Sequence, residues 1–105
     1  MGIQYADKEK QPGETIIYGM TFAPGKAIAT VDTLTGSPTV TVARTSDSAI
    51  VTSAMLSGSA TRSGDTISAK IIGGTDGENY KITFICSTTN GEVVEEDLVI
   101  RVREL

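Results

Sequence analysis

The sequence predicts a single all-β domain, and three observations support this prediction. At 105 residues the chain is long enough for one modest hydrophobic core and too short for two. No stretch shows the three- and four-residue spacing of apolar residues that an amphipathic helix requires. Short segments in which apolar and polar residues alternate recur instead, and Gly, Pro, Ser and Asp separate them. About seven such strands, with turn signals every ~8–12 residues, are typical of a sandwich or barrel.

The first half of the chain contains three candidate strands. The first spans 14–22 and sets its larger apolar side chains on one face: Ile16, Tyr18, Met20 and Phe22. Pro24-Gly25 ends it with a turn, and a second candidate with poor alternation follows over 26–33. The cluster at 35–38, which contains Gly36 and Pro38, breaks the chain again before a short strand over 40–44.

The second half contains the clearest strand patterns. A loosely patterned piece over 50–56 precedes a strand over 66–72, which Gly64-Asp65 introduces. Asn90-Gly91 then predicts a hairpin with a type I′ turn, because both residues tolerate the positive φ that this turn requires. Its strands are expected to point these side chains inward: Tyr80, Ile82, Phe84 and Cys86, then Leu98, Ile100 and Val102. Val99, Arg101 and Arg103 are expected to point outward.

Gly77 and Tyr80 narrow the choice of fold. In immunoglobulin-like sandwiches a tyrosine that opens the penultimate strand folds back onto the backbone of the preceding loop. Tyr80 has this place, after a Gly-rich loop, and we expect its hydroxyl to bond a buried carbonyl; an ordinary core tyrosine is the alternative. The sequence therefore predicts an immunoglobulin-like (fibronectin III-like) Greek-key β-sandwich of about seven strands, formed by residues 14–105.

Residues 1–13 are expected to form an N-terminal arm. Its only sizeable apolar side chains are Ile3 and Tyr5, so it has little to bury against its own domain. We predict that a partner orders this arm, with Ile3 and Tyr5 as anchors and Lys8 among the charged residues that set the register. A terminus without a role is the alternative.

Composition excludes several classes of function. The formal net charge of −4 and the scattered Lys and Arg argue against nucleic-acid binding, which needs a basic surface. No apolar run approaches the ~20 residues of a membrane span, and the polar N-terminus lacks the apolar core of a secretory signal, so we expect no membrane partner. The single cysteine excludes an intrachain disulfide and fits synthesis in a reducing cytoplasm.

No residue pattern predicts a catalytic, metal or cofactor site. The chain has no histidine, so Ser-His and Cys-His nucleophiles are absent, and we expect no enzyme activity. Cys86 alternates inward with Phe84, which favours a small buried residue over a reactive thiol. The acidic run Glu92, Glu95, Glu96 and Asp97, and the loop residues Asp65 and Asp76, lack the spacing of a calcium loop. Solvated charge is the favoured interpretation of these carboxylates, and calcium binding is the alternative.

Three pieces of the chain together carry a family resemblance. They read IQYADK, QPGETIIYGMTF, and SAMLSGSATRSGDTISAKIIGGTDGENYKITFICSTTNGEVVEEDLVIRV. In these pieces, which cover well over half of its length, the chain resembles short immunoglobulin-like proteins encoded among the head and tail morphogenesis genes of tailed bacteriophages. Many of those proteins carry a tryptophan-rich segment between their first two strands, where this chain has only Pro24-Gly25-Lys26.

The resemblance implies a virion structural protein made in the cytoplasm of the bacterial host. The main hypothesis is a capsid decoration or cement protein, or an accessory subunit at the head–tail junction. Its expected partners are the major capsid protein or the head–tail and neck proteins of the same virion, with homo-oligomer formation left open. Many weak contacts per particle would supply avidity. The alternative is a cell-surface or carbohydrate-binding adhesion module associated with a fibre or tail.

Overall fold

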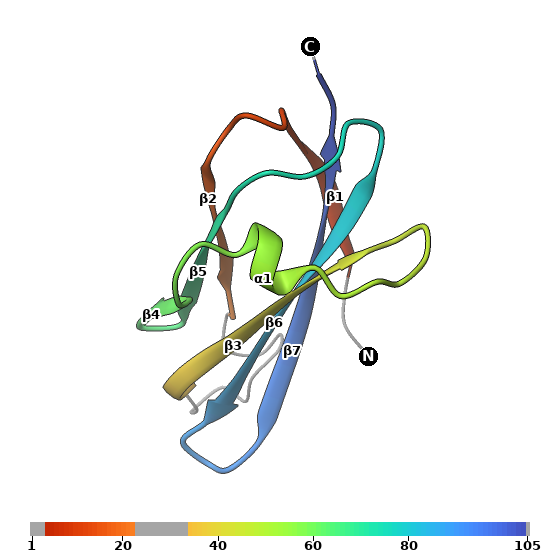
Figure 1. Ribbon diagram of the computed structural model, residues 1–105. Helices are drawn as coiled ribbons and strands as arrows, with labels where there is room; N and C mark the ends of the chain where they lie inside the picture. Colours follow the sequence, from red (N-terminus) through yellow and green to blue (C-terminus); the bar gives the residue numbers. More distant parts are fainter. Residues whose placement is uncertain (1–3, 23–33, 105) are drawn as a thin grey trace.

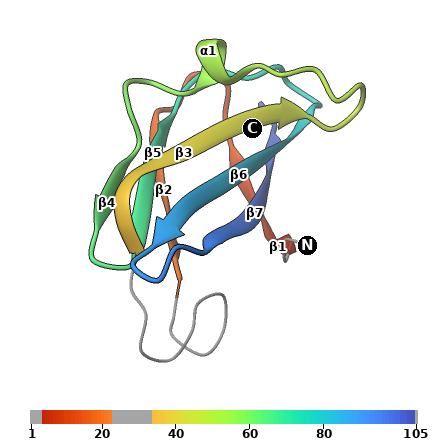
Figure 2. The ribbon, with the colours of Figure 1, turned by 90° about the horizontal axis from the view of Figure 1, so that it is seen from below.

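The protein is mostly β and sandwich-like, as the computed structural model in Figure 1 shows. The structure describes residues 4–22 and 34–104, with side chains from Lys8 onward. In this part of the chain one sheet has the order β1-β7-β6-β3, from strands β1 (Gln4–Lys10), β3 (Leu34–Arg44), β6 (Asn79–Thr88) and β7 (Val93–Val102). The other has the order β2-β5-β4, from β2 (Ile16–Thr21), β4 (Thr61–Ser63) and β5 (Thr66–Ile71). One helical turn, α1 (Thr52–Met55), lies at one end of the two layers (Figure 2).

A single core fills the space between the sheets. The side chains that are completely inaccessible come from both layers and alternate along their strands, as a sheet with one buried face requires. They include Phe22, Val42, Ile67, Ile71, Ile82, Phe84, Ile100 and Val102. Burial of these side chains is the main favourable contribution to folding, at about 25 cal/mol per Å² of apolar surface.

The strand patterns expected at 14–22, 66–72, 80–87 and 98–103 are confirmed as β2, β5, β6 and β7. Their predicted inward residues are buried, except that Ile16 is half-buried. Val99 lies on the outer face of β7 as expected, but it is only 9% exposed, so this face is not open to solvent at that position. The candidate strand over 26–33 lies outside the described residues.

Two other expectations for the chain's middle are wrong. The cluster at 35–38 does not break the chain, because β3 runs through it from Leu34 and absorbs it as a register shift opposite β6. Gly36 permits this irregularity with a φ of 74°. The piece at 50–56 forms α1 rather than a strand, with isolated bridges at Ile50 and Leu56 on either side of it.

The β6–β7 turn also differs from the expected type I′ turn. Its closing bond runs from the Gly91 N–H to the Thr88 carbonyl at 3.0 Å, so Gly91 is the fourth residue of the turn. Gly91 has a φ of 88°, whereas Asn90 is not among the described residues with positive φ. This is the pattern of a type I turn followed by a left-handed glycine, the second common hairpin solution.

The N-terminal segment is a strand of the domain in this structure. Residues 4–10 pair in parallel with β7, from Gln4 opposite Asp97 to Lys10 opposite Val102, with an irregularity between Tyr5 and Lys8. The expectation that this segment has little to bind within its own domain is therefore corrected. Backbone pairing with β7 holds this segment in place, and the low hydrophobic content of the segment did not predict this pairing.

Candidate interaction surfaces

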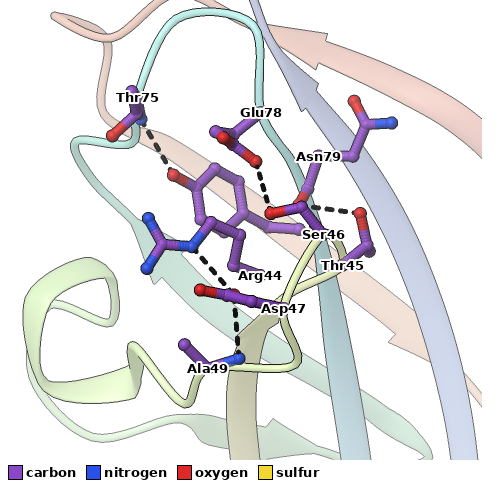
Figure 3. A network of polar contacts seen from close by, with 9 residues as sticks. Arg44, Thr45, Ser46, Asp47, Ala49, Thr75, Glu78 and Asn79 are labelled. Carbon is purple, nitrogen blue, oxygen red and sulfur yellow. Dashed lines mark hydrogen bonds and ion pairs between the residues drawn. The ribbon is translucent and has the colours of Figure 1, made fainter.

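Polar contacts join two loops at one end of the sandwich (Figure 3). The turn after β3 lies against the start of β6, where the Thr45 N–H and hydroxyl both donate to the Asn79 carbonyl at 3.0 and 3.2 Å. The Ser46 hydroxyl donates to a Glu78 carboxylate oxygen at 2.9 Å. Side chains thus hold this turn in place, although most of them are exposed.

Within the same turn, Arg44 and Asp47 form an ion pair. The Arg44 Nε lies 3.1 Å from the Asp47 Oδ1, which also accepts the Ala49 N–H at 3.1 Å. The backbone hydrogen bond from Ala49, followed by the bond and charge of Arg44, holds the pKa of Asp47 below its ordinary value. Both side chains are partly exposed, so the pair shapes the turn more than it stabilises the fold.

Tyr80 and Gly77 lie beside this turn. The Tyr80 hydroxyl accepts the Thr75 N–H at 2.9 Å, so it bonds a backbone N–H and not the carbonyl that the sequence suggested. Gly77 has a φ of 88° and its N–H donates to the Val102 carbonyl at 2.8 Å, which ties the loop to β7. How much this corner stabilises the fold stays a prediction.

A shallow groove of about 480 Å³ runs along the outer face of the four-stranded sheet, beside its β3 edge. Thr41 and Ala43 of β3 and Lys81 and Thr83 of β6 form its floor, and the turn after β3 supplies its wall. Ile50, 71% exposed, lines this groove. Sequence reasoning missed this feature, since an isoleucine in a β-like stretch carries no signal that it faces solvent.

The predicted partner-contact residues map to β1 or just before it. Ile3 lies outside the described residues, and of Tyr5 only the backbone is described, opposite Leu98. Lys8 is exposed and pairs with Ile100. The structure thus sets Tyr5 and Lys8 on an edge strand of the larger sheet, and their role in binding stays a prediction.

The candidate calcium ligands do not form one cluster. No group of three or more acidic or thiol side chains that could hold a metal ion is found in residues 4–22 and 34–104. Several of these carboxylates have structural partners instead: Asp65 accepts the Leu34 N–H, Asp76 accepts the Glu104 N–H, and Asp97 accepts the Thr83 hydroxyl.

Glu96 corrects the interpretation of the acidic run as solvated charge. Its side chain is 4% exposed, and its Oε2 has no hydrogen-bond partner among the described residues. The alternation of β7 could have predicted the burial of Glu96, since Glu96 shares a face with Leu98 and Ile100. Cys86 is buried as expected, with its thiol donating to the Thr35 carbonyl at 3.3 Å.

These features define a class of protein: a small, sandwich-like β protein with a grooved outer face and exposed apolar side chains. In the part that the structure describes, no helix is long and apolar enough to cross a membrane. Residues 10–101 match the family model described as Gp77, the podophage GP4 fiber-tail adaptor protein gp77. The chain therefore belongs to this family, and it is a structural component of a phage tail. Neither the curated proteins nor the solved structures contain a match.

Family membership corrects the main hypothesis drawn from the sequence. The resemblance correctly predicted a phage virion protein, but the family is a component of the tail and not a decoration of the capsid surface. The alternative hypothesis, which named a fibre- or tail-associated module, is closer in location. The family is structural, which agrees with the expectation of a non-enzymatic protein.

Proposed function

We propose that this protein links the phage tail to its fibers by binding a tail protein with one surface and a fiber protein with another. The observation that carries the proposal is the family match, which spans nearly the whole described domain. The partners are then other tail and fiber proteins of the same virion, in place of the major capsid protein.

The arrangement of the larger sheet supports a two-sided adaptor. Its order, β1-β7-β6-β3, sets β1 and β3 at opposite edges. The groove with Ile50 lies beside the β3 edge, whereas Lys8 lies on β1. We infer that each edge contacts a different partner, with Ile3, Tyr5 and Lys8 at one contact and Ile50 at the other. Contacts on opposite edges allow both partners to bind at once.

We further infer that the fold is of the immunoglobulin type. The supporting features are the parallel pairing of the first strand with the last, the two-sheet strand order, and the Tyr80 hydroxyl bond into the preceding loop. Carbohydrate binding has less support. The aromatic side chains that the structure describes, Tyr18, Phe22, Tyr80 and Phe84, are all buried, so none of them offers a stacking platform.

Binding of the purified protein to purified tail and fiber proteins of the same phage tests the adaptor role. We expect a ternary complex in size-exclusion chromatography. Ile50→Lys should remove one partner and Lys8→Glu the other, because each changes one edge only. Val93→Lys is the matched control, since Val93 is 68% exposed at the hairpin and lies outside both surfaces. Binding to assembled heads with no affinity for tail or fiber proteins would contradict the proposal.

A further inference from the structure

The edges of the two sheets are protected to different degrees. An exposed strand edge invites pairing with another chain, and proteins normally block it with charges, prolines, short strands or covering segments. At the β3 edge the Val42 carbonyl accepts the Val51 N–H at 2.8 Å and the Arg44 N–H donates to the Ala49 carbonyl at 2.9 Å. Pro38 also lies in β3 and offers no N–H. The β3 edge is therefore covered.

Two further edges carry other forms of protection. Strand β4 has three residues, and its Arg62 donates through Nε to the Gly36 carbonyl at 3.0 Å, which joins it to β3. Strand β1 exposes the charged side chains of Lys8 and Glu9. Charges on an edge strand oppose pairing.

Among the described residues, strand β2 has none of these protections. Its six residues, Ile16–Thr21, include no charge and no proline, and β2 ends its sheet in the described structure. The Phe22 N–H donates to the Asp65 carbonyl at 2.8 Å, so alternate residues from Phe22 back to Ile16 direct their backbone groups toward β5. The N–H and C=O groups of Ile17, Gly19 and Thr21 consequently point to the free edge.

Gly19, at the centre of this strand, leaves the outer face of the sheet without a side chain beside Thr66 and Ser68. It is exposed and its φ is not in the positive range, so the backbone conformation does not require glycine. A Cβ at this position would meet its nearest neighbours at 3.7–3.8 Å, an ordinary contact distance. Glycine within a strand weakens it, and often marks a place where another backbone approaches closely. Nothing in the described chain explains the glycine, which points to a partner.

We propose that β2 pairs antiparallel with β2 of a second copy of this chain, about a two-fold axis at Gly19. The pairing joins the two three-stranded sheets into one. It sets Ile17, which is 64% exposed, opposite the partner's Thr21, a pair of β-branched side chains that suits adjacent strands. Because β2 has no charged residue, two copies of it bring no like charges together when they pair. The two-fold contact is closed, so it leaves no further β2 edge open.

Cysteine cross-linking tests the register directly. The single native cysteine is buried, so Gly19→Cys supplies an accessible thiol. Residues that form a hydrogen-bonded antiparallel pair have Cα atoms ~5.5 Å apart, within the range that a disulfide spans. We expect mild oxidation to convert Gly19→Cys into a covalent dimer, whereas Ile50→Cys, which is also exposed but lies on another face, stays monomeric on denaturing gels. Absence of the Gly19→Cys cross-link would overturn the register.

Light scattering after size-exclusion chromatography tests the unmodified protein. We expect twice the mass of one chain for the wild type and for Ile50→Lys, and the mass of one chain for Ile17→Lys, whose circular dichroism should stay that of the wild type. A monomeric wild type at every concentration, or a dimeric Ile17→Lys, overturns the proposal. Either result leaves the adaptor role intact if the protein still binds tail and fiber proteins, so the two proposals fail separately.

Discussion

At the scale of single residues, two buried tyrosines differ in the hydrogen bonding of their hydroxyl groups. The Tyr80 hydroxyl accepts the Thr75 N–H, whereas the buried Tyr18 hydroxyl has no hydrogen-bond partner among the residues that the structure describes. Burial, and then the nearby charge of Glu14, raise the pKa of Tyr18 above its ordinary value. An unsatisfied buried hydroxyl costs free energy, but a satisfied one contributes to stability.

Phenylalanine substitutions at these two positions should therefore have different effects. Tyr80→Phe is expected to lower the free energy of unfolding by about 1–2 kcal/mol, because the Thr75 N–H loses its acceptor. Tyr18→Phe, the matched control, should be neutral or slightly stabilising, because no hydrogen bond is lost. Urea denaturation measures both. Equal effects of the two substitutions would show that Tyr80 only packs.

Lys10 is a second residue whose environment has a measurable consequence. Its side chain is 1% exposed, and its Nζ donates to the carbonyls of Gly73 at 2.6 Å and Gln11 at 2.9 Å. Burial lowers the pKa of this ammonium below its ordinary value of 10.5, although the charge of Glu14 opposes the shift. The folded protein therefore loses this proton at a lower pH than the unfolded chain does.

The free energy of unfolding that Lys10 contributes therefore depends on pH. Between the lowered pKa and 10.5 the unfolded chain binds more protons, so the free energy of unfolding contributed by Lys10 rises with pH. We expect the wild type to gain stability relative to Lys10→Met as the pH increases through this window. Denaturation of both proteins over a series of alkaline pH values measures the difference, in which the titration of Tyr18 cancels. Parallel curves would contradict this role for Lys10.

At the scale of elements, the β6–β7 hairpin depends on one backbone conformation. Gly91 takes a φ of 88°, which costs a residue with a side chain about 1–2 kcal/mol. Gly91→Ala should lower the free energy of unfolding by about this amount. Gly13→Ala is the control, since a Cβ there has open space and its φ is outside the positive range. We expect Gly13→Ala to be neutral or stabilising by up to about 1 kcal/mol. Thermal melts compare the two, and an unaffected Gly91→Ala would argue against this turn type.

At the scale of the whole molecule, the first strand determines what a truncation can test. Deletion of residues 2–10 removes β1, its parallel pairing with β7 and the buried Lys10 side chain. We expect the truncated protein to unfold at a lower denaturant concentration than the full chain, because β7 becomes an unprotected edge. Reduced incorporation into tails would then reflect lost stability as well as lost contacts. Unchanged stability together with lost incorporation would restore the simple arm hypothesis.

Alternation along the chain was enough to predict which faces of β2, β5, β6 and β7 are buried. In a strand, side chains alternate with a period of two, so the burial pattern can be predicted from the local sequence, as at Ile67, Ala69 and Ile71. The mostly β architecture followed from the same repeated pattern. The Asn90-Gly91 pair likewise located the hairpin, although not its turn type.

The remaining features could not be predicted from the sequence, because each depends on contacts between residues that are far apart in the chain. Strand β1 exists because β7 offers it an edge, and the irregular stretch around Gly36 continues β3 because β6 lies beside it. The inward position of Glu96 was readable from alternation, but the lack of a partner for its Oε2 was not. Whether Ile50 and Ile17 face solvent was equally hidden, because the exposure of an apolar side chain depends on which elements pack against it.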